Sequence, residues 1–335
     1  MKDITIKDIA NEAGVSISTV SRVINGNYPV RQEVREKVEA VMKELEYHPN
    51  AVARSLRINK TNLIALVVAD LSNHFFMEIA KGLELEVSKM GYHLVIASSG
   101  GDIEKERELI DTLVGKRIDG LVIASSDSDG GKIQKCLSLG IPVVLVDRTI
   151  KNITTNQILW NDFDSSYKLT KLLTDNGHKK LAIVNVTLTN PNGSNRLEGF
   201  KQAVADAGIP VSEAFISPSN FSGRQAYDYV MKIMKEENRP TAIYCANNIM
   251  LEGTLQALRE LNLKVYDDVS VAAFGNLECN KYITPQITSA DQDSLEMGHQ
   301  AGEILSGLLA GKNTYSTQII LDSKIVERGS VKKIR

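Results

Sequence analysis

The side chains with the most specific potential chemistry in this 335-residue chain lie between residues 16 and 25. One side of a predicted helix carries Val20 and Val23, and the opposite side carries Ile17, Ser18, Ser21 and Arg22. An arginine on such a helix can donate two hydrogen bonds to guanine in the DNA major groove. Serine hydroxyls and the helix N-terminus suit phosphate oxygens. This face is a candidate for base recognition, the alternative being a small helical bundle whose Arg22 is merely solvated.

Three short helices would position this face. Thr5 is a suitable N-cap for a first helix that ends at Gly14, and Ser16 is an N-cap for a second helix that closes at Asn25–Gly26. A third helix is predicted from about Arg31 to Leu45, with a valine-rich stripe. Two helices joined by a glycine turn and covered by a third form a helix-turn-helix. Residues 1–60 hold ten basic and eight acidic side chains, so charge alone is weak support for DNA binding.

The remainder of the chain reads as repeated strand–helix units. Apolar runs suited to buried parallel strands recur at Leu63–Ala69, Leu94–Ala97, Gly120–Ala124, Pro142–Val146, Leu181–Val186, Ala242–Ala246 and Val269–Phe274. Amphipathic helices are predicted between them, among them Phe75–Lys89, Ile103–Val114, Ser165–Asp175, Leu197–Ala207 and Asn248–Leu261. The pattern is that of an α/β architecture with parallel sheets.

A second set of candidate functional residues follows the apolar runs. Ligands of open α/β sheets bind beyond the carboxyl ends of the strands. The residues at those positions are Asp70, Ser98, Ser125, Asp147–Arg148, Asn161, Thr187, Asn247–Asn248 and Gly275–Asn276. Most of them can hydrogen-bond, which suits a hydroxylated small molecule. Each alone could equally be a turn or cap residue, so the set carries more weight than any member.

Several function classes are disfavoured. The chain has a net charge of −2 and no apolar run near the roughly 20 residues of a membrane span. Its N-terminus has no apolar signal-peptide core, so we expect a cytoplasmic protein without a membrane partner. Cys136, Cys245 and Cys279 have no metal-ligand spacing. No hydrolase, metalloprotease, phosphate-loop or dinucleotide motif is present, so we expect no catalysis, metal or cofactor. An enzyme and an exported solute receptor remain the alternatives.

The N-terminal segment TIKDIANEAGVSISTVSRVINGNYPV, followed by REKVEAVMKELEYHPNAVARSLR, resembles the LacI/GalR family of transcription regulators. The resemblance implies that Ile17, Ser18 and Arg22 read bases and that phosphates are held by Thr5, Ser16, Thr19, Ser21 and Asn25. Residues 50–56 resemble the family's hinge helix, which implies DNA contacts by Asn50, Ala53, Arg54 and Leu56. In that family the leucine enters the minor groove; such an apolar wedge costs a few kcal/mol of unstacking and kinks the duplex. A plain interdomain linker is the alternative.

The resemblance continues through DLSNHFFMEIAKGLE, DGLVIASS, IPVVLVDR, NGHKKLAIV, NRLEGF, ANNIMLEGTLQAL and TPQITSADQD. It implies a two-subdomain effector domain like that of periplasmic binding proteins, with a ligand cleft between the subdomains. We expect a DNA-binding domain at 1–48, a hinge at 49–60 and an effector domain at 61–330. Its N-subdomain would comprise about 61–160 and 291–322, and its C-subdomain about 161–290 and 323–330. The expected cleft residues are Asn73, Phe75, Ser125, Asp147, Arg148, Trp160, Asn161, Arg196, Phe221, Asn248, Asn276 and Gln292.

Three carboxylates usual in the family are replaced here. Trp160–Asn161 occupies the position of the family's Asp-Asn pair. Gly275 occupies the position of a strand-end aspartate, and Asn248 occupies the position of another aspartate. Arg148 and Arg196 remain as cationic donors, and arginine suits carboxylates and phosphates. We therefore predict an anionic effector, a sugar acid or a sugar phosphate. Trp160 could stack on this effector or could be a packing residue.

The resemblance also implies a mechanism. We expect a homodimer that presents two recognition helices to a pseudo-palindromic operator and represses a carbohydrate or sugar-acid operon. The effector would change the placement of the two DNA-binding heads, which is a coupling free energy between two sites. The C-terminal residues lack sustained heptads, which disfavours a coiled-coil tetramer.

Overall fold

The computed structural model describes residues 4–25, 28–47, 60–186, 191–218, 222–312 and 315–334. The chain divides into two compact units, Met1–Thr61 and Asn62–Arg335. The first unit consists of three helices, α1 (Ile6–Glu12), α2 (Ile17–Asn25) and α3 (Gln32–Glu44). Their apolar faces meet in one small core built from Ile9, Ala10, Ala13, Val20, Val23, Val38 and Val41. The predicted helix-turn-helix is therefore present.

Local sequence signals explain the turns of this first unit. Thr5 and Asp8 form a capping box at the start of α1, in which the Thr5 backbone N–H donates to the Asp8 carboxylate over 2.8 Å. Gly14 has a φ of +62° between α1 and α2, a conformation that glycine adopts without steric cost. The Thr19 backbone N–H donates to the Ser16 hydroxyl over 3.2 Å, so Ser16 caps α2 as predicted.

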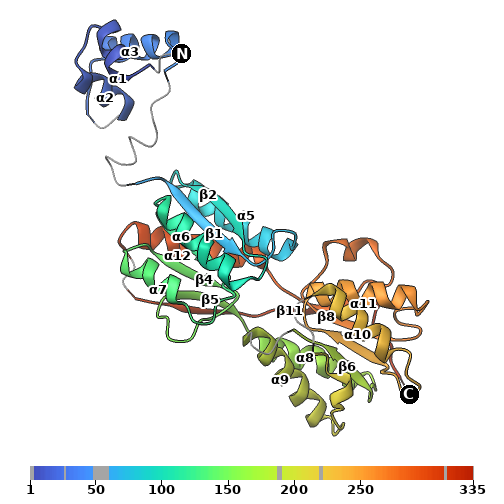
Figure 1. The fold of residues 1–335 in the computed structure, drawn as a ribbon. Coiled ribbons are helices and arrows are strands. Elements are labelled where there is room, and N and C mark those ends of the chain that lie inside the picture. The colour runs from blue at the N-terminus through green and yellow to red at the C-terminus, as the bar shows by residue number, and fades with distance from the viewer. Residues whose placement is uncertain are drawn as a thin grey trace. The chain divides into compact units, whose positions relative to one another are not determined.

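The second unit contains two sheets, which define two lobes (Figure 1). The larger lobe has a six-stranded parallel sheet in the order β10-β5-β4-β3-β1-β2. Its strands are β1 (Leu63–Val68), β2 (His93–Ser98), β3 (Gly120–Ile123), β4 (Val143–Val146), β5 (Asn156–Trp160) and β10 (Gln318–Leu321). Its helices are α5 (His74–Ser88), α6 (Ile103–Gly115), α7 (Gly131–Ser138) and α12 (Ser294–Leu309).

The smaller lobe has a five-stranded sheet in the order β11-β9-β8-β7-β6. Its strands are β6 (Leu181–Val184), β7 (Ala242–Cys245), β8 (Ser270–Phe274), β9 (Thr288–Asp291) and β11 (Lys324–Val326). The accompanying helices are α8 (Asp162–Asp175), α9 (Pro191–Asp206), α10 (Gly223–Ile233) and α11 (Asn248–Glu260), with two 3₁₀ turns at Glu213–Phe215 and Glu278–Tyr282. The chain passes between the lobes after β5, after β9 and after β10.

Each of the seven apolar runs predicted as strands coincides with a strand of these sheets, six containing the strand and Leu94–Ala97 lying within β2. The predicted α/β architecture with parallel sheets is confirmed, and one edge adds an antiparallel pairing, of β11 with β9. The helices α8 and α9 begin earlier than predicted, at Asp162 and Pro191. No helix among the described residues combines the length and the apolar character needed to cross a membrane.

Close helix packing completes the larger lobe. A Cβ added to Gly82 of α5 would lie 2.2 Å from the Leu295 carbonyl oxygen, and one added to Gly298 of α12 would lie 2.1 Å from the Ile79 carbonyl oxygen. These two helices therefore touch backbone to backbone, which only glycine permits. Their contact holds α5 against α12, and Asn73 and Phe75 lie at the N-terminal end of α5.

Candidate DNA-binding face and effector cleft

The outer face of α2 exposes the predicted base-reading side chains. Ile17 is 45% exposed, and Ser18 and Arg22 are also exposed, although Val20 on the opposite side is fully buried. Ser21 and Thr19 are half-buried rather than fully exposed. The Arg22 guanidinium lies over the Tyr28 ring, 5.6 Å from its centroid. This aromatic contact, which our sequence analysis missed, limits the conformations open to the arginine.

Hydroxyl groups gather at the N-terminus of α2. The Ser16 hydroxyl lies 2.8 Å from the Ser18 hydroxyl and 2.8 Å from the Thr19 hydroxyl. Such a cluster at a helix N-terminus suits a phosphate oxygen. The Thr5 hydroxyl, by contrast, donates to the Asp8 carboxylate over 2.6 Å, so a phosphate would have to compete for it.

Some predicted contact residues cannot be placed. Seven of them lie outside the described part of the chain: Asn50, Ala53, Arg54, Leu56, Thr187, Phe221 and the side chain of Asn25. Their roles stay predictions.

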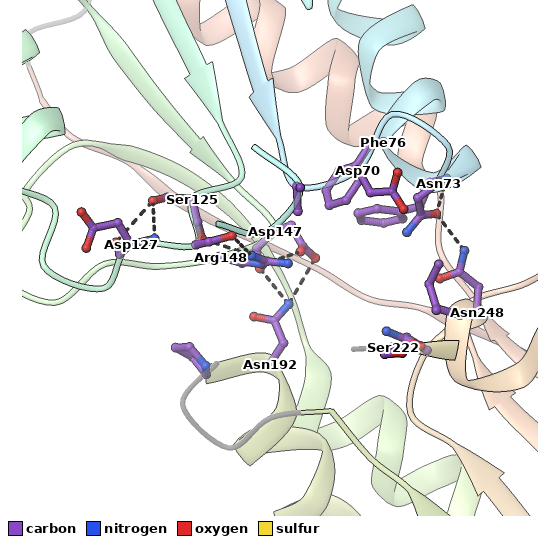
Figure 2. Close-up of a pocket in the computed structure, with 18 of the residues that line it drawn as sticks. Asp70, Asn73, Phe76, Ser125, Asp127, Asp147, Arg148, Asn192, Ser222 and Asn248 are labelled. Carbon is purple, nitrogen blue, oxygen red and sulfur yellow. Dashed lines mark hydrogen bonds and ion pairs between the residues drawn. The ribbon is translucent and has the colours of Figure 1, made fainter. Parts of the chain in front are cut away.

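A cleft of about 750 Å³ lies between the two lobes. Eight predicted effector residues line it, drawn from both lobes: Asn73, Phe75, Ser125, Asp147, Arg148, Arg196, Asn248 and Gln292. Figure 2 shows polar side chains converging here from strand ends and helix N-termini. Asp70 and Asn247, which follow strands β1 and β7, also line it. The structure thus brings together side chains that are up to about two hundred residues apart in the sequence.

Three predicted effector residues do not line this cleft. Trp160 is only 4% exposed and belongs to the hydrophobic core of the larger sheet, so it is a packing residue and cannot stack on a ligand in this arrangement. The Asn161 amide donates to the Asp322 carboxylate over 3.0 Å, where two of the interlobe connections run side by side. Asn276 lines a smaller neighbouring pocket of about 220 Å³.

Two residue pairs form hydrogen bonds between the lobes directly across the cleft (Figure 2). The Asn248 amide of α11 donates to the Asn73 side-chain oxygen, at the start of α5, over 2.8 Å. The Asn192 amide of α9 donates to the Asp147 carbonyl over 3.0 Å and to the Asp147 carboxylate over 3.2 Å. Both pairs combine residues of opposite lobes, so a ligand that enters between them changes the interlobe contacts.

Arg196 is buried and has a carboxylate partner. Its Nε donates to the Asp162 carboxylate over 2.7 Å, and its Nη1 donates to the Ala246 carbonyl over 2.7 Å. The guanidinium also stacks on the Phe274 ring, with 3.7 Å to the centroid. Burial raises the pKa of Asp162 to about 6, and the positive charge of Arg196 opposes part of that rise.

Arg148 also lies next to a carboxylate. Its Nε lies 3.6 Å from the carboxylate of Asp147, a residue held in the left-handed region at a φ of +63°. Burial raises the pKa of Asp147 and lowers that of Arg148, and the opposite charge of each partner counteracts the shift of the other. Our prediction of an anionic effector treats both arginines as available donors. Both arginines contact aspartates, and an uncharged effector would leave this balance intact.

Sequence reasoning missed further polar residues in and behind the cleft, among them four that form hydrogen bonds within the site. Asp127 and Asn192 line the cleft, whereas Asp162 and Glu106 lie behind it and hold Arg196 and the Ser125–Ser126 turn. Asp127 lies four residues after the end of β3. A search that considered more residues after each predicted strand would have included it. Within the described part of the chain, no group of three or more histidine, cysteine or carboxylate side chains could hold a metal ion.

Comparison with known proteins agrees with this arrangement. Residues 5–50 match the model of bacterial regulatory proteins of the lacI family. Residues 61–325 match the model of periplasmic binding proteins and the sugar binding domain of the LacI family. The second match alone covers more than half of the chain.

Individual relatives extend over nearly the whole length. The chain is 34% identical over 333 residues to the ribose operon repressor of Haemophilus influenzae, covering 99% of each chain. It is 36% identical over 331 residues to the HTH-type transcriptional repressor PurR of Vibrio parahaemolyticus, covering 98% of this chain and 99% of the relative. The lac repressor dimer bound to operator and an anti-inducer is similar in structure, with a TM-score of 0.85 and 26% identity over 99% of this chain and all of that one. The predicted family is thereby confirmed: the chain belongs to the LacI family of bacterial regulatory proteins and is a DNA-binding transcriptional regulator rather than an enzyme.

Proposed function

We propose that the protein represses transcription as a homodimer on a pseudo-palindromic operator, under the control of a hydroxylated sugar-class effector in the interlobe cleft. The observation that carries this proposal is the cleft itself, in which side chains from both lobes contact one another directly through Asn248–Asn73 and Asn192–Asp147. A ligand that replaces these contacts alters the relation between the lobes. The match of residues 61–325 to a sugar binding domain and the ribose operon repressor relative support the ligand class.

The head would read DNA through the outer face of α2. Ile17, Ser18 and Arg22 are exposed there and are assigned to base edges. The hydroxyl cluster of Ser16, Ser18 and Thr19 supports phosphate binding at the helix N-terminus. We assign further phosphate contacts to Thr5, Ser21 and Asn25. We assign the DNA contacts of the hinge to Asn50, Ala53, Arg54 and Leu56.

The cleft favours an uncharged ligand. Arg148 and Arg196 each contact an aspartate, so the charges of these two arginines are balanced by their partners. Most of the remaining polar lining consists of amides and hydroxyls, which exchange hydrogen bonds with sugar hydroxyls, and Phe75 supplies an apolar surface. We therefore assign the effector to neutral sugars, with Asn73, Phe75, Ser125, Asp147, Arg148, Arg196, Asn248 and Gln292 as its contacts.

Exposed apolar side chains support the homodimer. Four apolar side chains are more than a third exposed: Leu85 at the C-terminal end of α5, Met90 just after it, and Val95 and Ile96 of β2. The strand β2 is at the edge of its sheet, where unpaired backbone groups and apolar side chains favour association with another chain. The related lac repressor is a dimer on its operator.

The proposed domain organisation follows from these assignments. The DNA-binding domain comprises 1–48, the hinge 49–60 and the effector domain 61–330. The N-subdomain comprises about 61–160 and 291–322, and the C-subdomain comprises about 161–290 and 323–330. A regulator of bacterial operons acts where the DNA is, so we place the protein in the cytoplasm.

In vitro selection tests the DNA-binding part of the proposal. The full chain is incubated with a library of random duplexes, and bound duplexes are amplified and sequenced. We expect enrichment of an inverted repeat, because a symmetric dimer presents two identical recognition helices. Enrichment of an asymmetric single site, or of no site, would contradict the proposed dimeric operator complex.

A further inference from the structure

The carboxylate of Glu106 lies behind the wall of the effector cleft. Glu106 belongs to α6 and is only 1% exposed, and it is not among the residues that line the cleft. An acidic side chain this deeply buried is rare unless hydrogen bonds or an opposite charge compensate for its desolvation.

Glu106 holds the turn that follows β3. Its carboxylate accepts a 2.7 Å hydrogen bond from the Ser126 backbone N–H and a short one from the Ser125 hydroxyl. The neighbouring Arg107 donates to the Asp127 carboxylate over 2.8 Å, so consecutive residues of α6 fix consecutive residues of the turn. Ser125, Ser126 and Asp127 all line the cleft.

The same turn connects Glu106 to Arg148. The Arg148 Nη1 donates to the Ser126 hydroxyl over 3.0 Å and contacts the Ser125 carbonyl at 3.4 Å. Arg148 itself lines the cleft and is 9% exposed. The carboxylates of Asp147 and Glu106 both favour the charged form of its guanidinium, against the effect of burial. The Asp147 carboxylate pairs directly with this guanidinium, and the Glu106 carboxylate is held on the same Ser125–Ser126 turn that the guanidinium contacts. This negative charge lowers the need of Arg148 for an anionic ligand.

We infer that Glu106 is a positioning residue that sets the charge preference of the cleft. It orients the Ser125–Ser126 turn and, with Asp147, balances Arg148, so that the site accepts an uncharged hydroxylated ligand over its acid. This inference rests on the proposed function, because it assumes that the effector binds in this cleft. If Glu106 had only a structural role, its substitution would weaken the binding of neutral and acidic ligands alike. If Glu106 sets the charge balance, its substitution changes the ratio of the two affinities.

The test compares matched neutral and acidic sugars. The full chain is first screened by thermal shift with ribose and ribonate, and with glucose and glucuronate. The pair that raises the unfolding temperature more is selected, and calorimetry then measures the dissociation constants of its neutral and acidic members. Glu106→Gln keeps the size and one acceptor oxygen but removes the charge. We expect the ratio of neutral to acid affinity to shift about tenfold towards the acid, as expected for the loss of one partly screened charge. Glu108→Gln, which removes the same charge from an exposed position of α6, should leave the ratio unchanged.

A second experiment needs no ligand. In Glu106→Gln/Arg148→Gln both charges are absent, so Glu106 and Arg148 no longer leave each other uncompensated. The loss of the Asp147 ion pair is common to the double variant and to Arg148→Gln alone, so it cancels in the comparison. We expect the two substitutions to be coupled, with the double variant unfolding at a higher denaturant concentration than the sum of the single effects predicts. If Glu106→Gln alone does not fold, coupling predicts that Arg148→Gln restores folding in the double variant, and a double variant that also fails to fold would refute the role of Glu106.

The outcomes separate the two proposals. If no neutral or acidic sugar stabilises the wild-type chain, the proposed sugar effector is wrong, and the unfolding experiment still tests Glu106. If wild type binds a sugar but Glu106→Gln keeps the same ratio, or if the two substitutions have additive effects on unfolding, the role of Glu106 is refuted.

Discussion

At the scale of single residues, Arg22 combines exposure with a defined orientation. It projects from α2 and stacks on Tyr28, so part of its conformational entropy is lost before DNA is bound. We expect Arg22→Ala to weaken operator binding by about 1–3 kcal/mol and to relax the base preference at one position. Binding of operator variants at constant salt measures both effects. An unchanged operator affinity would contradict the assignment of Arg22 to a base.

His178 is a buried histidine, although it directly follows the Asn176–Gly177 turn at the end of α8. It is 1% exposed, and its two ring nitrogens lie 2.9 Å from the Thr241 hydroxyl and 3.1 Å from the Lys332 carbonyl. Burial lowers its pKa below the ordinary value of 6.5. The unfolded chain therefore takes up a proton below about pH 6.5 that the folded chain does not, and stability falls as the pH is lowered through this range.

The variant His178→Gln tests this linkage, because glutamine can hydrogen-bond but does not titrate. We expect the free energy of unfolding of wild type to fall more between pH 7.5 and pH 5.5 than that of the variant. Urea unfolding at both pH values measures the difference. Equal pH dependence in the two proteins would show that His178 is not the titrating group.

Residue types alone could identify much of the site but not its charge. Strand-end positions and the family resemblance lead to eight side chains that line the cleft. The ion pair of Arg196 with Asp162 was not predictable in the same way, because it depends on side-chain orientation across helices α8 and α9. The same holds for Trp160, whose burial is decided by the packing of the whole lobe.

At the scale of elements, strands that form a continuous apolar run are predictable, even at the sheet edges occupied by β2 and β6, whereas strands with polar or partly exposed side chains are not. β9 contains Thr288 and Ser289, both buried, whose hydroxyls contact the Arg328 carbonyl and the Asp291 carboxylate. Hydropathy misses such a strand because its burial depends on hydrogen bonds to a distant segment. β10 and β11 are edge strands with partly exposed side chains, so they lack a continuous apolar run.

The contact between α5 and α12 gives a prediction at this scale. A methyl group on Gly298 would overlap the Ile79 carbonyl, so Gly298→Ala should destabilise the effector domain by about 1–3 kcal/mol. Gly115, at the end of α6, has no atom within 4 Å of an added Cβ and serves as the control. Chemical unfolding should show a loss for Gly298→Ala and none for Gly115→Ala. Equal stability of the two variants would mean that the helices can separate without cost.

At the scale of the whole molecule, the two functions of the chain lie in separate units. The head, within Met1–Thr61, carries the DNA-binding face, and Asn62–Arg335 carries the cleft. Communication between them requires an effector that interacts differently with two arrangements of the lobes. A change from one arrangement of the lobes to the other would form or break the hydrogen bonds of Asn248 with Asn73 and of Asn192 with Asp147.

The most direct test is the affinity of the full chain for its selected operator, measured by fluorescence anisotropy at one fixed salt concentration with and without a saturating sugar effector. We predict a change in operator affinity of about 5- to 150-fold, and an equal change in sugar affinity when operator is present, because the coupling of two binding sites is reciprocal. An operator affinity that is the same with and without the bound sugar would contradict effector-controlled repression.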